Sequence, residues 1–503
     1  MNGLSRFGIL ALAACMAASP ALHSQDKPDD KAADKDKKPE GPAPKEESSV
    51  TDHTIKLAGQ SIPYKAIAQT MLLKDDKGES TAVVYSTAYI RSDVKDPSTR
   101  PIAFLYNGGP GSSSVWLHMG SFGPRRVITV NAAITPPAPY KVEDNSYSLL
   151  DKCDLVFVDP VGTGWSRAAK PDGAGAFWGV RRDSESIAKV IALYVAKNGR
   201  ASSPKYILGE SYGGFRAAKV ASDLRSDQGI VVTGILMVSP MVESGLHSGS
   251  DRLALGAALQ LPSLVATELE RTGSFSQEAL AQAEHFALTD YLTTLAGPPL
   301  SGDLAKAFYS RVAQMTGLPE DVVARSRGFI RGAYVKNLRL GEHKIVSHYD
   351  ATFAIDDPHP ESPEMRGPDP LLDGVVRAYG GAFVAYARDE LGFKTDLTYN
   401  LLSSEISDKW DWHDGSGHAP PSATDELREL LALTPSFRLM IAHGYSDMAT
   451  PYAVSRYVLD HLPPSVDEER SELRLYRRGH MFYTDPQSRK GFTADARTLY
   501  AQP

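Results

Sequence analysis

The first residue in this sequence that could carry out chemistry is Ser211. It lies in residues 209–213, which read GESYG, with a glycine at either end. The run 206–208 predicts a strand before the serine, and a helical pattern begins near Phe215. In such a turn the glycines let the backbone fold sharply and expose the serine oxygen at a helix N-terminus. The five-residue pattern alone is common by chance, but this context predicts that Ser211 is a nucleophile.

A serine nucleophile needs a base to take its proton and a carboxylate to orient that base. Two candidates follow at the ends of expected strands. Asp447 comes just after the run 438–442, and His480 comes just after the run 472–476. Either residue alone could be a hydrogen-bonded turn residue. Their order after the serine and their positions at strand ends favour a catalytic triad.

The oxygen that becomes negative during acyl transfer needs backbone N–H donors. One donor is expected from Tyr212, the residue after the nucleophile, and the second from a loop that follows an earlier strand. Residues 107–112 read NGGPGS and follow the apolar run 102–106. Without the serine turn this loop would be interpreted as an ordinary Gly/Pro turn, and beside it the loop is a candidate for the second donor.

The elements that must position these residues alternate along the chain. Strands are expected over residues 81–90, 102–106, 155–158, 206–208, 234–238, 438–442 and 472–476. Several are continuous apolar runs, which is typical of strands covered on both faces. Helical patterns lie between them, notably over 183–197 and 215–225. The alternation predicts an α/β fold with a mostly parallel, doubly wound sheet.

The alternation stops between about residues 241 and 404. Helical patterns there cover 262–271, 277–295, 304–315 and 319–327. A Pro-rich passage over 357–370 is too long for a simple connection. We therefore expect a helical lid over 241–404, inserted between two parts of the core at 51–240 and 405–503.

Residues 1–24 do not have the pattern of a folded element. Arg6 is their only charge, and the apolar run 7–14 that follows is too short to span a bilayer. This pattern predicts an export signal, which directs the chain to the periplasm, the cell envelope or the medium. Residues 25–50 are rich in Lys, Asp, Glu and Pro and are expected to be a disordered spacer.

The export signal allows two kinds of processing. Residues 12–15 read LAAC and are similar to a bacterial lipoprotein box, in which Cys15 would carry the lipid. The alternative is cleavage after a small residue such as Ala21 or Ser24, which would remove Cys15. No transmembrane helix is expected in the mature chain in either case.

The composition argues against several classes of function. The chain has 54 Lys and Arg against 61 Asp and Glu, a net charge of −7, which gives no attraction for nucleic acid. Two cysteines, Cys15 and Cys153, exclude a disulfide framework and a thiolate-rich zinc site. Neither an H-E-x-x-H motif nor a nucleotide-binding glycine loop occurs, so neither a metal nor a cofactor is expected.

Together these motifs resemble the serine carboxypeptidase family of α/β-hydrolases. The matching stretches are NGGPGSSS (107–114), FVDPVGTGWS (157–166), GESYGG (209–214), HGYSDMATP (443–451) and RGHM (478–481). The resemblance implies an α/β-hydrolase fold and the removal of single amino acids from peptide C-termini through an acyl-enzyme. It implies Ser211, Asp447 and His480 as the triad. It also implies an oxyanion hole made by the backbone N–H groups of Gly109 and Tyr212.

The resemblance further implies that Asn107 and Glu210 hold the terminal carboxylate of the peptide. An ionised Glu210 would repel that carboxylate, so its pKa must rise, through burial or a second carboxyl nearby. Family members carry this second carboxyl two residues before a Gly-Pro pair. This chain has Ser121 there, before Gly123 and Pro124. This chain therefore lacks the carboxyl pair, and the resemblance does not imply the acidic pH preference that is typical of the family.

Three functions compete at this point. The first is an exported carboxypeptidase, which the carboxylate-binding pair Asn107 and Glu210 favours. The second is an esterase or acyltransferase that uses the same triad, because only the group that accepts the acyl carbonyl differs. The third is an envelope binding protein with an inactive site, which the intact triad argues against. The side-chain preference, the oligomeric state and the physiological substrate remain open.

Overall fold

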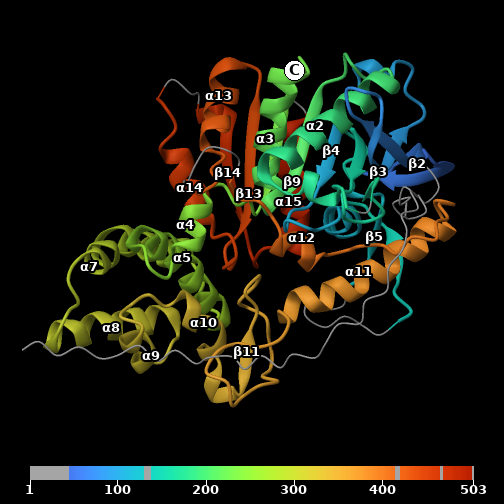
Figure 1. The fold of residues 1–503 in the computed structure, drawn as a ribbon. Helices are drawn as coiled ribbons and strands as arrows, with labels where there is room; N and C mark the ends of the chain where they lie inside the picture. The colour runs from blue at the N-terminus through green and yellow to red at the C-terminus, as the bar shows by residue number, and fades with distance from the viewer. Residues whose placement is uncertain (1–44, 130–137, 171, 414–419, 465–467, 501–503) are drawn as a thin grey trace, which may run out of the picture. The chain divides into compact units, whose positions relative to one another are not determined.

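The computed structural model describes residues 45–129, 138–170, 172–413, 420–464 and 468–500 (Figure 1). The expected export signal, Cys15 and most of the expected spacer lie outside the described residues. In the described ranges, no helix combines the length and the apolar composition that crossing a membrane requires.

A ten-stranded sheet lies at the centre, in the order β1-β2-β3-β7-β4-β9-β10-β13-β14, with β8 paired to β3 (Figure 1). Its strands are β1 (Ser48–Leu57), β2 (Gln60–Lys74), β3 (Ser80–Arg91), β7 (Asp154–Val158), β4 (Ile102–Tyr106), β9 (Lys205–Glu210), β10 (Gly234–Val238), β13 (Arg438–Gly444), β14 (Ser471–Tyr476) and β8 (Arg167–Ala168). Every neighbouring pair from β7 to β14 is parallel, whereas β1, β2 and β3 join antiparallel. The predicted strands are all present, and the predicted mostly parallel sheet is confirmed.

Helices cover both faces of this sheet. On one face, α2 (Val180–Lys197), α3 (Tyr212–Asp227) and α13 (Thr424–Leu433) pack on side chains such as Phe104 of β4. On the other face, α11 (Pro370–Asp389) and α15 (Pro486–Leu499) share a cluster with Leu105, the next residue of β4. Successive side chains of a strand point to opposite faces, so an all-apolar strand requires both layers. The doubly wound arrangement is therefore confirmed.

The sheet begins earlier than the sequence analysis predicted. The expected spacer ended at residue 50, but β1 starts at Ser48, and the Glu47 carbonyl accepts a hydrogen bond of 2.8 Å from the Thr70 amide. Glu46 also forms an ion pair of 2.6 Å with Lys197. The strands β1 and β2 were missed because β1 lies at the sheet edge and alternates exposed and partly buried residues. Its polar side chains resemble those of the spacer.

The segment 241–404 belongs to the same compact unit, Pro44–Pro503, as the sheet. The helices α5 (Ala254–Arg271), α6 (Gln277–Phe286), α8 (Gly302–Thr316), α9 (Glu320–Arg325) and α10 (Arg331–Asn337) surround an apolar cluster of their own. A two-stranded antiparallel sheet follows, β11 (Lys344–Val346) with β12 (Ala354–Asp356). The helix α11 instead packs against the central sheet. The expected lid thus comprises two parts with different packing partners.

One helix of this segment has a corrected start. A helix was expected over residues 262–271. In the structure α5 begins at Ala254 and contains Pro262 in its interior. The residues before Pro262 include Ala257, Ala258 and Leu261, whose burial in the cluster favours a continuous helix despite the lost hydrogen bond.

Candidate active site

Ser211 occupies the sharp turn between β9 and α3. Its φ is 61° and its ψ is −126°, a conformation that side chains other than glycine rarely adopt. A Cβ at Gly209 would lie 1.9 Å from the Gly213 carbonyl oxygen, so the turn requires glycine there. The Ser211 amide donates a hydrogen bond of 2.9 Å to the Val238 carbonyl. The turn therefore has the predicted strand-to-helix form, with the strain concentrated at the serine.

Asp447 and His480 meet beyond the carboxyl ends of β13 and β14. Their side chains form a hydrogen bond of 2.8 Å between His480 Nδ1 and Asp447 Oδ2. Asp447 Oδ1 accepts hydrogen bonds from the amides of Ala449 (2.9 Å) and Thr450 (3.0 Å). The Thr450 hydroxyl lies 2.8 Å from Asp447 Oδ2 and 3.0 Å from His480 Nδ1. The sequence analysis missed Thr450, although it lies within the stretch that carries Asp447.

The charges of this pair suit an acid–base role. Burial would raise the pKa of Asp447, but attraction to His480 and the hydrogen bonds hold that pKa below its usual value. Burial would lower the pKa of His480, but attraction to Asp447 and their hydrogen bond raise that pKa above its usual value. Asp447 is therefore an anion at neutral pH, and His480 is a stronger base than an ordinary histidine.

Ser211 and His480 line one cavity of about 70 Å³. The other residues that line it are Asn107, Gly108, Gly109, Ser112, Trp116, Glu210, Tyr349, Leu372, Leu402 and Met481. Among the hydrogen bonds of the described residues, none joins the Ser211 hydroxyl to His480. Such bonds are often long without substrate and tighten when it binds. The structure thus brings most of the predicted site residues into one cavity, with Asp447 behind His480.

The loop 107–112 lies directly against the serine turn. A Cβ at Gly108 would lie 2.5 Å from the Tyr212 nitrogen and 2.6 Å from the Gly213 nitrogen, so only glycine allows this approach. Gly109 has a φ of 98°. Within the described part of the chain, the amides of Gly109 and Tyr212 have no hydrogen-bond acceptor. Two free donors therefore flank the serine, the arrangement that an oxyanion hole requires.

Glu210 is buried beside Ser211, and among the described residues only one of its oxygens is hydrogen-bonded. Its Oε2 accepts hydrogen bonds of 2.8 Å from Asn107 Nδ2 and 2.8 Å from the Tyr483 hydroxyl. Burial raises the pKa of Glu210 to about 7, although the charge of His480 and these hydrogen bonds act against the rise. Burial thus raises the pKa of Glu210, which in family members a second carboxyl at the position of Ser121 is expected to do. The sequence analysis did not identify Tyr483, which follows His480 closely.

A buried arginine supports both loops from below. Arg216 on α3 is 1% exposed and forms an ion pair of 2.6 Å with Asp183. Its guanidinium also donates to the Asn107 carbonyl oxygen and lies 5.0 Å from the centre of the Tyr212 ring. The sequence offered a signal, a charged residue on the apolar face of an expected helix, but nothing in it named the partner.

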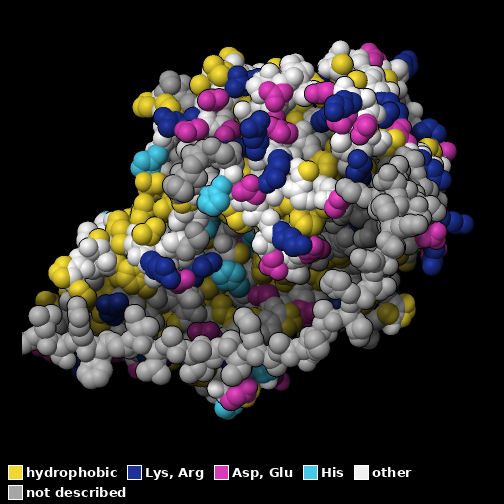
Figure 2. All heavy atoms as spheres, in the orientation of Figure 1, with side chains coloured by type: hydrophobic (Ala, Val, Ile, Leu, Met, Phe, Trp, Pro, Cys, Tyr) yellow, Lys and Arg dark blue, Asp and Glu magenta, His cyan; other side chains and the backbone are white. Residues whose placement is uncertain are grey.

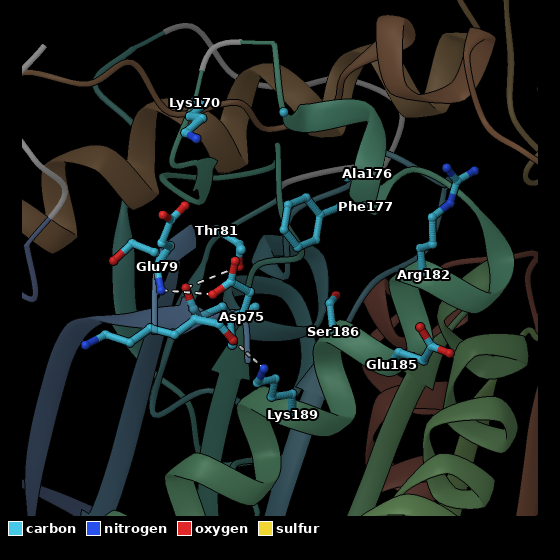
Figure 3. A pocket seen from close by; sticks show the side chains of 14 residues that line it. Asp75, Glu79, Thr81, Lys170, Ala176, Phe177, Arg182, Glu185, Ser186 and Lys189 are labelled. Atoms are coloured by element: carbon cyan, nitrogen blue, oxygen red, sulfur yellow. Dashed lines mark hydrogen bonds between the residues drawn. The ribbon is translucent and has the colours of Figure 1, made fainter. Parts of the chain in front are cut away.

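Neither of two other cavities is lined by both a serine and a histidine. One, of about 420 Å³, lies between β2, β3 and α2, with Asp75 and Glu79 on one side and Arg182 on the other (Figure 3). Asp75 accepts a hydrogen bond from the Glu79 amide, and Arg182 forms an ion pair with Asp411. The second lies beside α5, where Figure 2 shows hydrophobic side chains gathered on the left over the inserted helices. Across the described ranges, no group of acidic, histidine and cysteine side chains could hold a metal ion.

Comparison with known proteins agrees with these observations. Residues 80–247 match the family model described as serine carboxypeptidase. The matched range includes the loop at 107–112 and Ser211, but Asp447 and His480 lie outside it. A search of curated proteins found no match. The family match supports a hydrolase of the serine carboxypeptidase type.

The chain is also similar to solved structures. Kex1, a prohormone-processing carboxypeptidase from Saccharomyces cerevisiae, matches with a TM-score of 0.52 at 14% identity, over 87% of this chain and 90% of that chain. A proline iminopeptidase from Mycobacterium smegmatis matches with a TM-score of 0.34 at 15% identity, over 90% of this chain and 98% of that chain. The peroxisomal α/β-hydrolase Lpx1 from Saccharomyces cerevisiae matches with a TM-score of 0.37 at 9% identity, over 92% and 91%. The Kex1 match carries the comparison, and the predicted α/β-hydrolase fold is confirmed.

Proposed function

We propose that the chain is a serine carboxypeptidase, which removes the last residue of peptides by serine catalysis; the family match over residues 80–247 supports this. One observation carries the proposal. A buried glutamic acid, Glu210, lies in the same small cavity as Ser211 and His480, and its pKa of about 7 lets it hold a proton. A protonated carboxyl at this position can bind a carboxylate, which peptides with a free C-terminus provide and esters generally lack.

The proposed reaction proceeds in two steps. His480 takes the proton of Ser211, whose oxygen attacks the carbonyl carbon of the last peptide bond, and Asp447 stabilises the histidine cation that forms. The amides of Gly109 and Tyr212 donate to the oxygen that becomes negative. The C–N bond then breaks, and His480 passes the proton to the nitrogen of the departing amino acid. Water, activated by His480, hydrolyses the acyl-enzyme and regenerates Ser211.

The terminal carboxylate is assigned to Glu210 and Asn107. Glu210 Oε2 is already occupied by two donors, so its proton belongs on Oε1, for which no hydrogen bond occurs among the described residues. A protonated Oε1 can donate to a carboxylate oxygen of the peptide. The hydroxyl of Tyr483 holds the glutamic acid in this orientation.

The remaining wall of the cavity favours an uncharged, apolar last residue. It is formed by Trp116, Tyr349, Leu372, Leu402 and Met481. Glu210, the carboxyl in this lining, is assigned to the terminal carboxylate of the peptide, so a lysine side chain would enter without a partner. Burying an unpaired charge costs several kcal/mol, so we expect dipeptides ending in leucine to exceed those ending in lysine by roughly 100-fold in kcat/KM.

The deciding assay compares a blocked dipeptide that has a free C-terminus with the same peptide amidated. We expect release of the last residue from the free form only, because the amide cannot accept a proton from Glu210 in the way a carboxylate does. Equal cleavage of the two forms, or turnover of simple esters alone, would favour an esterase or acyltransferase that uses the same triad. The Glu210 environment favours the peptidase.

We also propose that the chain is exported. The support is the pattern of residues 1–24, a single basic residue followed by a short apolar run. Expression of the full chain in a bacterial host, followed by cell fractionation, tests export. Incorporation of labelled palmitate in wild type but not in Cys15→Ser would indicate a lipid anchor, and its absence from both would indicate ordinary cleavage.

A further inference from the structure

One loop of the inserted segment, residues 347–353, lies directly against the turn that carries His480. The His480 amide donates a hydrogen bond of 2.6 Å to the Tyr349 carbonyl oxygen. The Tyr349 ring meets the His480 ring edge-on, with 5.3 Å between the ring centres. Both the backbone and the imidazole of His480 are therefore in contact with a segment far away in the sequence.

The residue before the histidine is held by a carboxylate. The Gly479 amide donates a hydrogen bond of 2.9 Å to Asp350 Oδ2. A Cβ at position 479 would lie 2.2 Å from the Tyr349 carbonyl oxygen, so any other residue there would push the loop away. Glycine at 479 thus allows the inserted loop to reach the backbone of the catalytic turn.

The second oxygen of the same carboxylate extends this contact to Arg478. Asp350 Oδ1 accepts hydrogen bonds from the Thr352 amide (3.0 Å) and hydroxyl (2.6 Å). Thr352 Oγ1 in turn accepts a hydrogen bond of 3.0 Å from Arg478 Nη1. Arg478 has a φ of 83°, a region that costs energy for any residue except glycine. The contacts of the inserted loop therefore fall on a strained backbone position two residues before His480.

Asp350 is 2% exposed, and each of its oxygens has at least one donor. Burial raises the pKa of Asp350 to about 6, so at neutral pH the group is mostly a carboxylate and accepts these bonds. A buried carboxylate is costly without hydrogen bonds, and here one of its donors belongs to the catalytic turn. The group is thus placed to set the position of that turn.

We propose that Asp350 is a positioning residue for His480, acting through the Gly479 amide and, through Thr352, on Arg478. The inserted segment then completes the catalytic turn, in addition to covering the cavity. This inference rests on the proposed function, since it assigns to His480 the role of base. The alternative is that Asp350 only stabilises its own loop through the Thr352 contacts.

The test compares kcat, KM and thermal unfolding of the full chain with Asp350→Asn, on a blocked dipeptide substrate. The asparagine side chain keeps only one of the two acceptor oxygens of Asp350. Its NH₂ group would then face either the Gly479 amide or the Thr352 donors. Because small displacements of catalytic groups reduce rates strongly, we expect kcat to fall about tenfold or more with little change in KM. Asp356→Asn, an exposed aspartate on β12, is the matched control and should keep wild-type kinetics.

Thr352 provides a second pair of variants in case Asp350→Asn does not fold. Thr352→Val removes the hydroxyl that donates to Asp350 and accepts from Arg478. We expect about a threefold lower kcat, because the loss of these two hydrogen bonds reaches His480 only through Asp350 and Arg478. Thr352→Ser keeps the hydroxyl and should restore the wild-type kcat. If both Asp350→Asn and Thr352→Val keep kcat within about twofold of wild type while only lowering the melting temperature, the proposal is wrong.

Labelling by a fluorophosphonate separates this inference from the proposed function. The reagent reports how well His480 activates Ser211, whatever the substrate, so its rate should fall with kcat in Asp350→Asn. If wild type is labelled but releases no residue from peptides, the carboxypeptidase proposal fails and labelling still decides the role of Asp350. If wild type is neither labelled nor active, both proposals fail.

Discussion

Ser211 and His480 are the proposed nucleophile and base, but different parts of the chain hold them. Ser211 stands on a turn between neighbouring elements, β9 and α3, and its glycines and the loop at 107–112 form the close contacts. His480 stands on a turn whose contacts come from Thr450 and from Tyr349 and Asp350 of the inserted segment. The turn at Ser211 is set mainly by its own backbone geometry, with the loop at 107–112 packed on it, and the turn at His480 mainly by side chains of distant segments.

This difference explains why one side of the site has a recognisable motif and the other a weaker one. A sharp turn next to a helix requires particular residues at fixed spacing, so the serine side carries glycines at 209 and 213. A turn held by a distant carboxylate requires Gly479 for the close approach, but the sequence position of the carboxylate itself is free. The serine side should therefore be sensitive to backbone changes, and the histidine side to changes in the inserted segment.

The largest expected effect is the loss of the nucleophile. Ser211→Ala should lower kcat by a factor on the order of 10⁶, because the triad acts as a unit and only binding and the oxyanion donors remain. The release of the last residue from a blocked dipeptide measures it. Thermal unfolding should stay at the wild-type temperature, since a single half-buried oxygen is removed. Activity that survives unchanged would remove Ser211 from the mechanism.

The second prediction breaks the support beneath the serine side. Arg216→Met leaves Asp183 buried without its partner, and we expect a loss of about 3–5 kcal/mol in the free energy of unfolding, measured with urea. The double change Asp183→Leu with Arg216→Met should lose less than the single change, because no charge is then left unpaired. Arg181→Met, in an exposed pair with Glu185, is the control and should have little effect. A similar small loss for Arg216→Met would contradict the role of the buried pair.

The third prediction concerns the proton of Glu210. The raised pKa of about 7 means that Glu210 is protonated below pH 7 and ionised above it. Wild-type kcat/KM should therefore fall above pH 7, approaching about tenfold per pH unit, as the proton that binds the peptide carboxylate is lost. Glu210→Gln carries a donor that does not titrate, so it should retain activity and lose less of it between pH 7 and pH 9. Complete inactivity of this variant at every pH would contradict the assignment.

The smallest expected effect is on the histidine side. Thr450→Val removes the hydroxyl that lies 2.8 Å from Asp447 and 3.0 Å from His480. We expect a loss of about 1 kcal/mol in stability and a decrease of several-fold in kcat, typical of one hydrogen bond. Thr450→Ser keeps the hydroxyl and should behave as wild type in both assays. If valine and serine give the same result, the hydroxyl does not orient the pair.

The parts of the fold that could be predicted are those with a short-range pattern. The parallel strands are apolar runs because both faces are covered, and the site residues follow at their carboxyl ends. The strands β1 and β2 were missed because their alternation includes many polar residues. The start of α5 was placed wrongly at Pro262, since burial of the preceding residues outweighs the cost of a proline in the helix.

The sequence by itself predicted the chemistry of the candidate site. Ser211, Asp447 and His480 could be proposed as a triad because each follows a strand, and the carboxyl ends of parallel strands lie at one edge of a sheet. Only the tertiary structure shows the burial that raises the pKa of Glu210 without a second carboxyl. Only the tertiary structure also shows which distant residues contact the candidate site residues or their turns: Tyr483, Arg216, Thr450 and Asp350. The physical reason is that burial and hydrogen bonds between distant segments depend on how the chain packs, and no spacing along the sequence encodes them.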